Sequence, residues 1–156
     1  MKINWKQLAL SIAIPLAVGG LSALLTGTAM EAFETMRKPP LSPPAEVFPV
    51  VWTILYTLMG ISSYLIFNSG AEPEEIRKAL ALYGYQLVVN FLWSTFFFSF
   101  QWYFFAFLWL LLLIGLTAAM ILEFSKLSKP AAWLNIPYLI WLIFAGYLNF
   151  AVWRLN

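Results

Sequence analysis

Hydrophobic residues in this chain fall into long runs separated by short polar or proline-rich segments. The longest run, residues 79–122, holds 44 positions without a charged side chain, about twice the roughly 20 residues that one membrane-spanning helix needs. The sequence Gln101-Trp102-Tyr103 lies near its middle and predicts a tight turn. The pattern therefore predicts an all-α, polytopic membrane protein, a five-transmembrane-helix bundle whose spans cover residues 8–28, 47–67, 79–100, 104–122 and 130–153.

The segment between the first two predicted spans, residues 29–46, is unusual for its prolines. Proline fixes its own φ and favours an extended conformation in the preceding residue, so Pro39-Pro40 and Pro43-Pro44 predict a stiff chain. We call residues 29–46 the lid segment. It is predicted either to cover one mouth of the bundle or to act only as a rigid linker.

The first span carries small residues at four-residue spacing, namely Gly19, Ala23 and Gly27. Such spacing allows another backbone to approach closely, which suits packing inside the bundle or a seam between two copies. The basic start of this run also resembles a signal peptide, but the run is long enough to span a membrane.

The composition agrees with one membrane domain that covers residues 1–156. Hydrophobic residues make up 62% and charged residues 10% of the chain, whereas soluble domains are about a quarter charged. The net charge of +2 gives no support for binding nucleic acid. The sequence contains no Cys and no His, which removes disulfides, thiolate metal sites and the commonest general base, so no metal site is predicted.

Basic residues are distributed unevenly between the two predicted sides of the membrane. Three fall on the side of the lid segment, Arg37, Lys38 and Arg154. Six fall on the other side, together with the N-terminus: Lys2, Lys6, Arg77, Lys78, Lys126 and Lys129. The positive-inside rule therefore predicts an integral membrane protein with a cytoplasmic N-terminus.

Aromatic and polar residues share inward faces on three predicted helices. Trp52 and Tyr56 are four residues apart on the second helix, with Phe48 one turn earlier. A polar stripe on the third helix must avoid lipid, and on the fifth helix aromatic residues share a face with a small one. These residues predict either hydrogen-bonded packing or the walls of a cavity for a flat, apolar ligand: Gln86, Asn90, Trp93 and Ser94 on the third helix, and Tyr138, Trp141, Ala145 and Asn149 on the fifth.

No charged side chain lies deep in any predicted span. Ion-driven transporters normally need such groups at membrane depth, so an ion-coupled mechanism is not expected. The sequence also lacks a nucleophile paired with a base, which gives hydrolytic chemistry no support.

At these residues the chain resembles the translocator protein family, also called tryptophan-rich sensory proteins or peripheral-type benzodiazepine receptors. The similarity runs through ordered motifs: Lys38-Pro39 to Pro43-Pro44, Phe48-Pro49, Val51-Trp52 and Leu55-Tyr56, then Gln86-Leu87, Asn90 and Trp93, then Ala132-Trp133-Leu134, Pro137-Tyr138, Trp141, Phe144-Ala145 and Leu148-Asn149. The resemblance implies a bundle that commonly forms a homodimer and a receptor or sensor that binds tetrapyrroles, such as protoporphyrin IX or haem, and drug-like hydrophobic ligands.

The resemblance also locates the site. The positions that match the family's pocket are Trp52, Tyr56, Asn90, Trp141 and Ala145. The predicted ligand-binding set also includes Phe48 and Ser94, which adjoin these positions, and Trp93 and Tyr138, which share the inward faces of the third and fifth helices. The first alternative is an enzyme that degrades porphyrin in light, with Trp52 and Trp141 as the catalytic residues and no cofactor required. The second alternative is a transporter of porphyrins or lipids. Both alternatives use the same pocket.

The chain departs from the family pattern at three positions. Leu41 stands where the loop usually has Trp, and Trp109 stands where the fourth helix often has an acid. Phe150 replaces the Tyr of the cholesterol motif, so cholesterol binding by that motif is not expected. Without His, bound haem would have no histidine axial ligand.

Overall fold

The computed structural model describes residues 2–27 and 29–156 and, within them, contains helices and no strands. The first predicted span ended at residue 28, which lies outside the described residues. The long helices are α1 (Trp5–Leu25), α3 (Val47–Phe67), α4 (Pro73–Ser94), α5 (Tyr103–Leu127) and α7 (Ile136–Leu155). The shorter elements are α2 (Ala29–Thr35), the π-helical turn η1 (Thr95–Ser99) and α6 (Lys129–Leu134).

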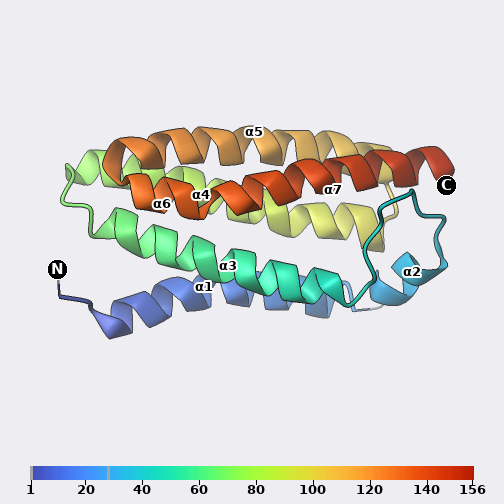
Figure 1. Ribbon diagram of the computed structural model, residues 1–156, viewed down its shortest axis with the longest axis horizontal. Coiled ribbons are helices and arrows are strands. Elements are labelled where there is room, and N and C mark those ends of the chain that lie inside the picture. Colours follow the sequence, from blue (N-terminus) through green and yellow to red (C-terminus); the bar gives the residue numbers. More distant parts are fainter. Residues whose placement is uncertain (1, 28) are drawn as a thin grey trace.

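The helices form two layers, which lie one above the other in Figure 1. α1 and α3 pack along each other as a pair, and α5 packs between α4 and α7 in the second layer. α6 and α4 also pack on α3 and so join the layers. The lid segment crosses one end of the bundle, beside the C-terminus (Figure 1), and we call this the lid end.

Among the described residues, four helical segments are long and apolar enough to cross a membrane: Trp5–Leu25, Val47–Phe67, Tyr103–Leu127 and Lys129–Leu155, the last made of α6 and α7. α4 is as long but less apolar, because charged residues fill its first turns and Gln86 and Asn90 its later ones. The all-α, polytopic fold class is therefore confirmed, whereas the count of five crossings stays a prediction.

The structure corrects three local expectations. α4 begins at Pro73 rather than near residue 79, because Pro73 suits a first helical position and Glu74 and Glu75 favour a helix N-terminus. The lid segment is not extended throughout, since α2 occupies its first part. The last predicted span, residues 130–153, is not one continuous helix but is divided into α6 and α7. The break is at Asn135, and Pro137 lies in the first turn of α7.

α1 and α3 approach closely at Gly60, a small residue of α3 that does not belong to the predicted small-residue stripe. A Cβ at Gly60 would lie 2.7 Å from the carbonyl oxygen of Ser11 and would also collide with the backbone of Ile12. A substitution there would push the two helices apart. Gly19 on α1 packs on the ring of Tyr56, so at this position the small-residue stripe serves packing inside the bundle.

Candidate ligand-binding site

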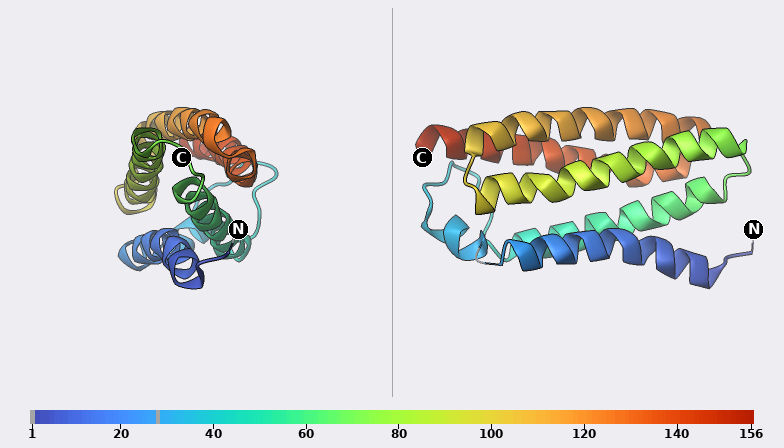
Figure 2. Two further views of the ribbon diagram at one scale, coloured as in Figure 1. Left: turned by 90° about the vertical axis from the view of Figure 1, so that its left-hand side faces the viewer. Right: turned by 180° about the vertical axis from the view of Figure 1, so that it is seen from behind.

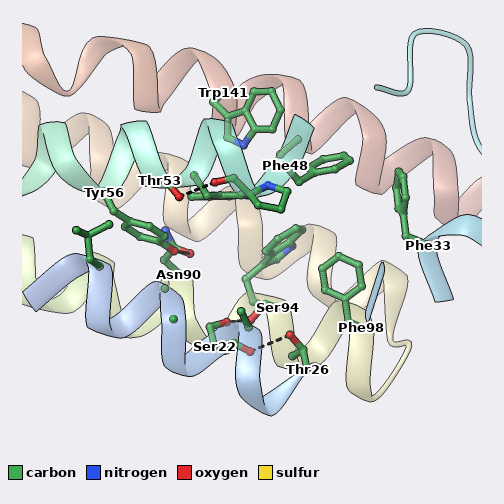
Figure 3. Close-up of a pocket in the computed structure, with 18 residues that line it drawn as sticks. Ser22, Thr26, Phe33, Phe48, Thr53, Tyr56, Asn90, Ser94, Phe98 and Trp141 are labelled. Atoms are coloured by element: carbon green, nitrogen blue, oxygen red, sulfur yellow. Dashed lines mark hydrogen bonds between the residues drawn. The ribbon is translucent and has the colours of Figure 1, made fainter. Parts of the chain in front are cut away.

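A cavity of about 270 Å³ lies between the two layers, toward the lid end of the bundle (Figure 3). α1 and α3 supply one wall and α4 and α7 the other, and Phe33 of α2 reaches it from the lid segment. The lining residues are Leu16, Gly19, Gly20, Ser22, Ala23, Thr26, Phe33, Phe48, Pro49, Trp52, Thr53, Tyr56, Asn90, Trp93, Ser94, Phe98, Trp141 and Ala145. None of them is charged, so the cavity suits an apolar body with few polar groups.

The aromatic wall of the cavity is built around Trp52. Its ring stacks on Tyr56 at a centroid distance of 5.4 Å and an interplanar angle of 27°. Trp141 on α7 stands perpendicular to Trp52, with centroids 6.5 Å apart, and Phe48 meets the edge of Trp141 at 5.9 Å. The four-residue spacing on α3 thus creates one face of stacked rings, as the sequence predicted, and the layer arrangement brings Trp141 to it.

Asn90 lies at the floor of the cavity within a chain of hydrogen bonds. The hydroxyl of Tyr56 donates to Asn90 Oδ1 at 3.2 Å, and Asn90 Nδ2 donates to the hydroxyl of Tyr138 at 2.7 Å. That hydroxyl donates in turn to Gln86 Oε1 at 2.8 Å. The amide of Asn90 is therefore held in one orientation by α3 and α7, with one N–H left over.

The structure corrects the placement of Tyr138. It was assigned to the pocket, but it is fully buried behind Asn90 and is absent from the cavity lining. Both hydrogen bonds of its hydroxyl run to α4. Gln86 is likewise fully buried and belongs to this packing network. The polar stripe of α4 is therefore divided between hydrogen-bonded packing at Gln86 and cavity lining at Asn90 and Ser94.

Trp93 also faces the cavity, and its orientation is fixed by a hydrogen bond that joins α4 to α7. Its Nε1–H donates to Asn149 Oδ1 at 3.0 Å, and Asn149 Nδ2 donates to the carbonyl of Tyr103 at 2.8 Å. The indole stacks on Phe97 at 5.4 Å. Asn149 thus orients an indole rather than lining the cavity.

The first helix contributes a side of the cavity that the sequence analysis missed. α1 places Gly20, Ser22 and Ala23 along it, and the hydroxyls of Ser22 and Ser94 form a hydrogen bond between α1 and α4. The available signal was modest. Ser22 and Thr26 are polar residues four apart in a mainly apolar run, next to small residues.

The lid segment is fastened to α7. The side chain of Asn156 pairs with the backbone of Arg37, accepting from its N–H at 3.2 Å and donating to its carbonyl at 2.9 Å. The hydroxyl of Tyr147 donates to the carbonyl of Pro40 at 2.7 Å. Lys38 places its ammonium 4.6 Å from the ring centre of Phe33, which lines the cavity. A positive charge therefore stands near the cavity at the lid end.

Within residues 2–27 and 29–156, no group of His, Cys, Asp or Glu is arranged to hold a metal ion. The polar groups that reach the cavity are hydroxyls, one amide and indole N–H groups. This set can position a ligand through hydrogen bonds.

Comparisons with known proteins agree with this architecture. A model of the TspO/MBR family matches residues 11–154. The tryptophan-rich protein TspO of Chlorobaculum tepidum is 37% identical, over 96% of this chain and 95% of its own length. The protein of that name from Archaeoglobus fulgidus is 34% identical over 99% of both, and the human translocator protein is 37% identical over 86% of this chain and 80% of its own. The predicted family is confirmed: this chain is an integral membrane protein of the TspO/MBR family.

Proposed function

We propose that this protein is a membrane receptor that binds porphyrins, or other flat hydrophobic ligands, in the cavity between its layers. The observation that carries the proposal is a contrast between indoles. Trp93 Nε1 donates to Asn149 and Trp109 Nε1 to the carbonyl of Val89, whereas those of Trp52 and Trp141 have no partner among the described residues. Two aromatic faces at the cavity therefore retain free donors that a ligand acceptor can use.

The position of Lys38 favours an amphipathic acid among flat ligands. A porphyrin has an aromatic body and carboxylates at one edge. With the body between Trp52 and Trp141, the carboxylates would point toward the lid end, where Lys38 and Arg37 are the nearby cations. The uncharged lining accepts the macrocycle and excludes the carboxylates.

A tryptophan-fluorescence titration with protoporphyrin IX tests the proposal. Asn90→Ala and Trp141→Phe should each weaken binding about tenfold. Trp133→Phe is the matched control, since that ring is 67% exposed and lies outside the cavity lining. Unchanged affinity in both cavity variants would refute the assignment of the site.

A second candidate function is light-driven degradation of the bound porphyrin, favoured by the closeness of Trp52 and Trp141 at 6.5 Å. The excited porphyrin would take an electron from an indole, leaving a porphyrin radical anion and an indole radical cation, and dissolved dioxygen would be the oxidant consumed as the ring is degraded. Illumination of the complex should then yield product in the parent, and Trp52→Phe should bind porphyrin but yield little product. Transport is the third candidate, and proteoliposome flux equal to that of protein-free vesicles would reject it.

The placement in the membrane follows from the charges. Lys78 and Lys126 both pair with Glu123, at 3.5 and 2.8 Å, at the end of the bundle opposite the lid. We propose that this end is cytoplasmic in a bacterial cell membrane and that the lid segment lies on the other side. A homodimer is proposed from the resemblance alone, and its test is the molar mass of the purified protein in detergent.

A further inference from the structure

The cavity reaches the outer surface of the molecule along α1. Gly20 and Ala23 line the cavity and are both exposed residues of α1. Within α1 only Pro15 is buried, so most of this helix faces the surroundings of the protein. Gly20 lies five residues before the last residue of α1, about 7.5 Å along the helix axis, which places it below the headgroup level if α1 spans the bilayer. The surroundings at this point are then lipid.

The boundary between α1 and α4, which we call the seam, is lightly closed. The hydroxyl pair of Ser22 and Ser94 forms the hydrogen bond across it, and among the described residues no other hydrogen bond joins α1 to the second layer. A Cβ built on Gly20 meets nothing within 4 Å, whereas one built on Gly19 would collide with the ring of Tyr56. The backbone at Gly20 therefore borders open space that leads inward.

The size of the cavity makes an opening necessary for a large ligand. Its volume of about 270 Å³ is slightly below the roughly 300–1,000 Å³ usual for ligand pockets. A tetrapyrrole with its substituents needs more room, so the two layers must separate as it enters. Separation at the seam costs one hydroxyl–hydroxyl bond. Opening the lid segment instead breaks the paired bonds of Asn156 and the bond of Tyr147.

We infer that the seam between α1 and α4 is a lateral entrance, through which a flat hydrophobic ligand passes from the bilayer into the cavity. The inference concerns the same cavity as the proposed function and rests on it for the identity of the ligand. Gly20 is then the residue that keeps the path open, and the hydrogen bond between Ser22 and Ser94 closes it. The lid segment holds the polar edge of the ligand and is not its way in.

The absence of cysteine from the chain allows a test that needs no porphyrin. Ala145→Cys places a single thiol in the cavity lining, and its labelling by a pyrene maleimide dissolved in the vesicle membrane is followed over time. Adding Gly20→Leu should slow labelling at least tenfold, because the leucine side chain fills the seam. Gly115→Leu is the matched control, since Gly115 on α5 is also exposed with nothing within 4 Å of its Cβ position, and the rate should stay unchanged.

Two results would overturn the inference. The first is equal labelling rates with Gly20→Leu and Gly115→Leu. The second is that a charged, membrane-impermeant maleimide labels Ala145→Cys faster than the pyrene maleimide does, and that Asn156→Ala increases this rate further. That result would place the entrance under the lid segment. Gly20→Leu and Gly115→Leu both replace glycine by a better helix former in open space, so loss of folding does not obscure the comparison between them. Failure of the parent to bind protoporphyrin IX would refute the proposed ligand and leave the labelling result standing.

Discussion

Replacement of Tyr138 by Phe removes one oxygen atom from the centre of the network that holds Asn90. The hydroxyl accepts from Asn90 Nδ2 at 2.7 Å and donates to Gln86 Oε1 at 2.8 Å, in a residue that is fully buried. Hydrogen bonds inside membrane proteins contribute about 0.6 kcal/mol on average and up to about 1.7 kcal/mol. A buried group left without a partner costs about 1 kcal/mol or more. With two bonds lost and two groups orphaned, we expect Tyr138→Phe to lower the free energy of unfolding by about 2–3 kcal/mol.

Thermal unfolding in detergent measures this loss as a decrease in Tm of about 5–10 °C. The chain contains its own control. Tyr83 is buried too, but its hydroxyl has no hydrogen-bond partner among the described residues. Tyr83→Phe should therefore leave Tm unchanged or raise it slightly, because it removes a buried hydroxyl without a partner and leaves the packing of the ring as it was. If both variants shift Tm alike, the hydrogen-bond network around Asn90 does not stabilise the bundle as described.

Three further predictions concern the lid segment and the cavity wall. Lys38→Gln should weaken binding of protoporphyrin IX about two- to fivefold and leave the affinity for its uncharged dimethyl ester unchanged in the same titration. An equal loss of affinity for both ligands would show that the charge of Lys38 has no role in binding. Leu41 is 82% exposed at a φ of 71°, so Leu41→Asn should relieve backbone strain and raise Tm by about 2–4 °C, whereas a lower Tm would contradict the strain. Trp93→Phe leaves Asn149 Oδ1 without its donor and should lower the free energy of unfolding by about 1 kcal/mol, whereas the control Trp133→Phe should leave it unchanged. A Trp93→Phe variant as stable as the parent would contradict the hydrogen bond between Trp93 and Asn149.

Much of the fold could be predicted from the sequence because the physical cause is local. Apolar runs of the length of a bilayer specify helices, and α3 begins and ends at the predicted residues 47 and 67. α4 differs because hydropathy marks where a helix meets lipid and not where it starts. The first turns of α4 are polar but helical, because Pro73 and the acidic residues after it favour the N-terminus of a helix. These residues mark where a helix begins and do not mark where it enters the membrane.

The site was predictable only as far as spacing along one helix decides it. Trp52 and Tyr56 share a face by the geometry of α3, and their ring stacking follows. Whether an inward residue lines a cavity or packs behind one depends on a second helix, which spacing does not show. Tyr138 and Trp141 are only three residues apart, yet Tyr138 is sealed against α4 and Trp141 borders the cavity. The contribution of α1 was missed for the same reason.

The two ends of the bundle are held together very differently, and this difference explains where the cavity lies. At the end opposite the lid, Asn135 Nδ2 donates to Ser62 Oγ at 2.7 Å, and Ser62 Oγ donates to the carbonyl of Ala131 at 2.8 Å, so α3 is bound to the second layer through fully buried groups. At the lid end, the hydroxyl pair of Ser22 and Ser94 is the corresponding tie between α1 and α4. Local opening occurs where few buried contacts must break. α1 can therefore separate from α4 at the lid end while the opposite end stays closed, and a ligand can enter between these two helices without unfolding the bundle.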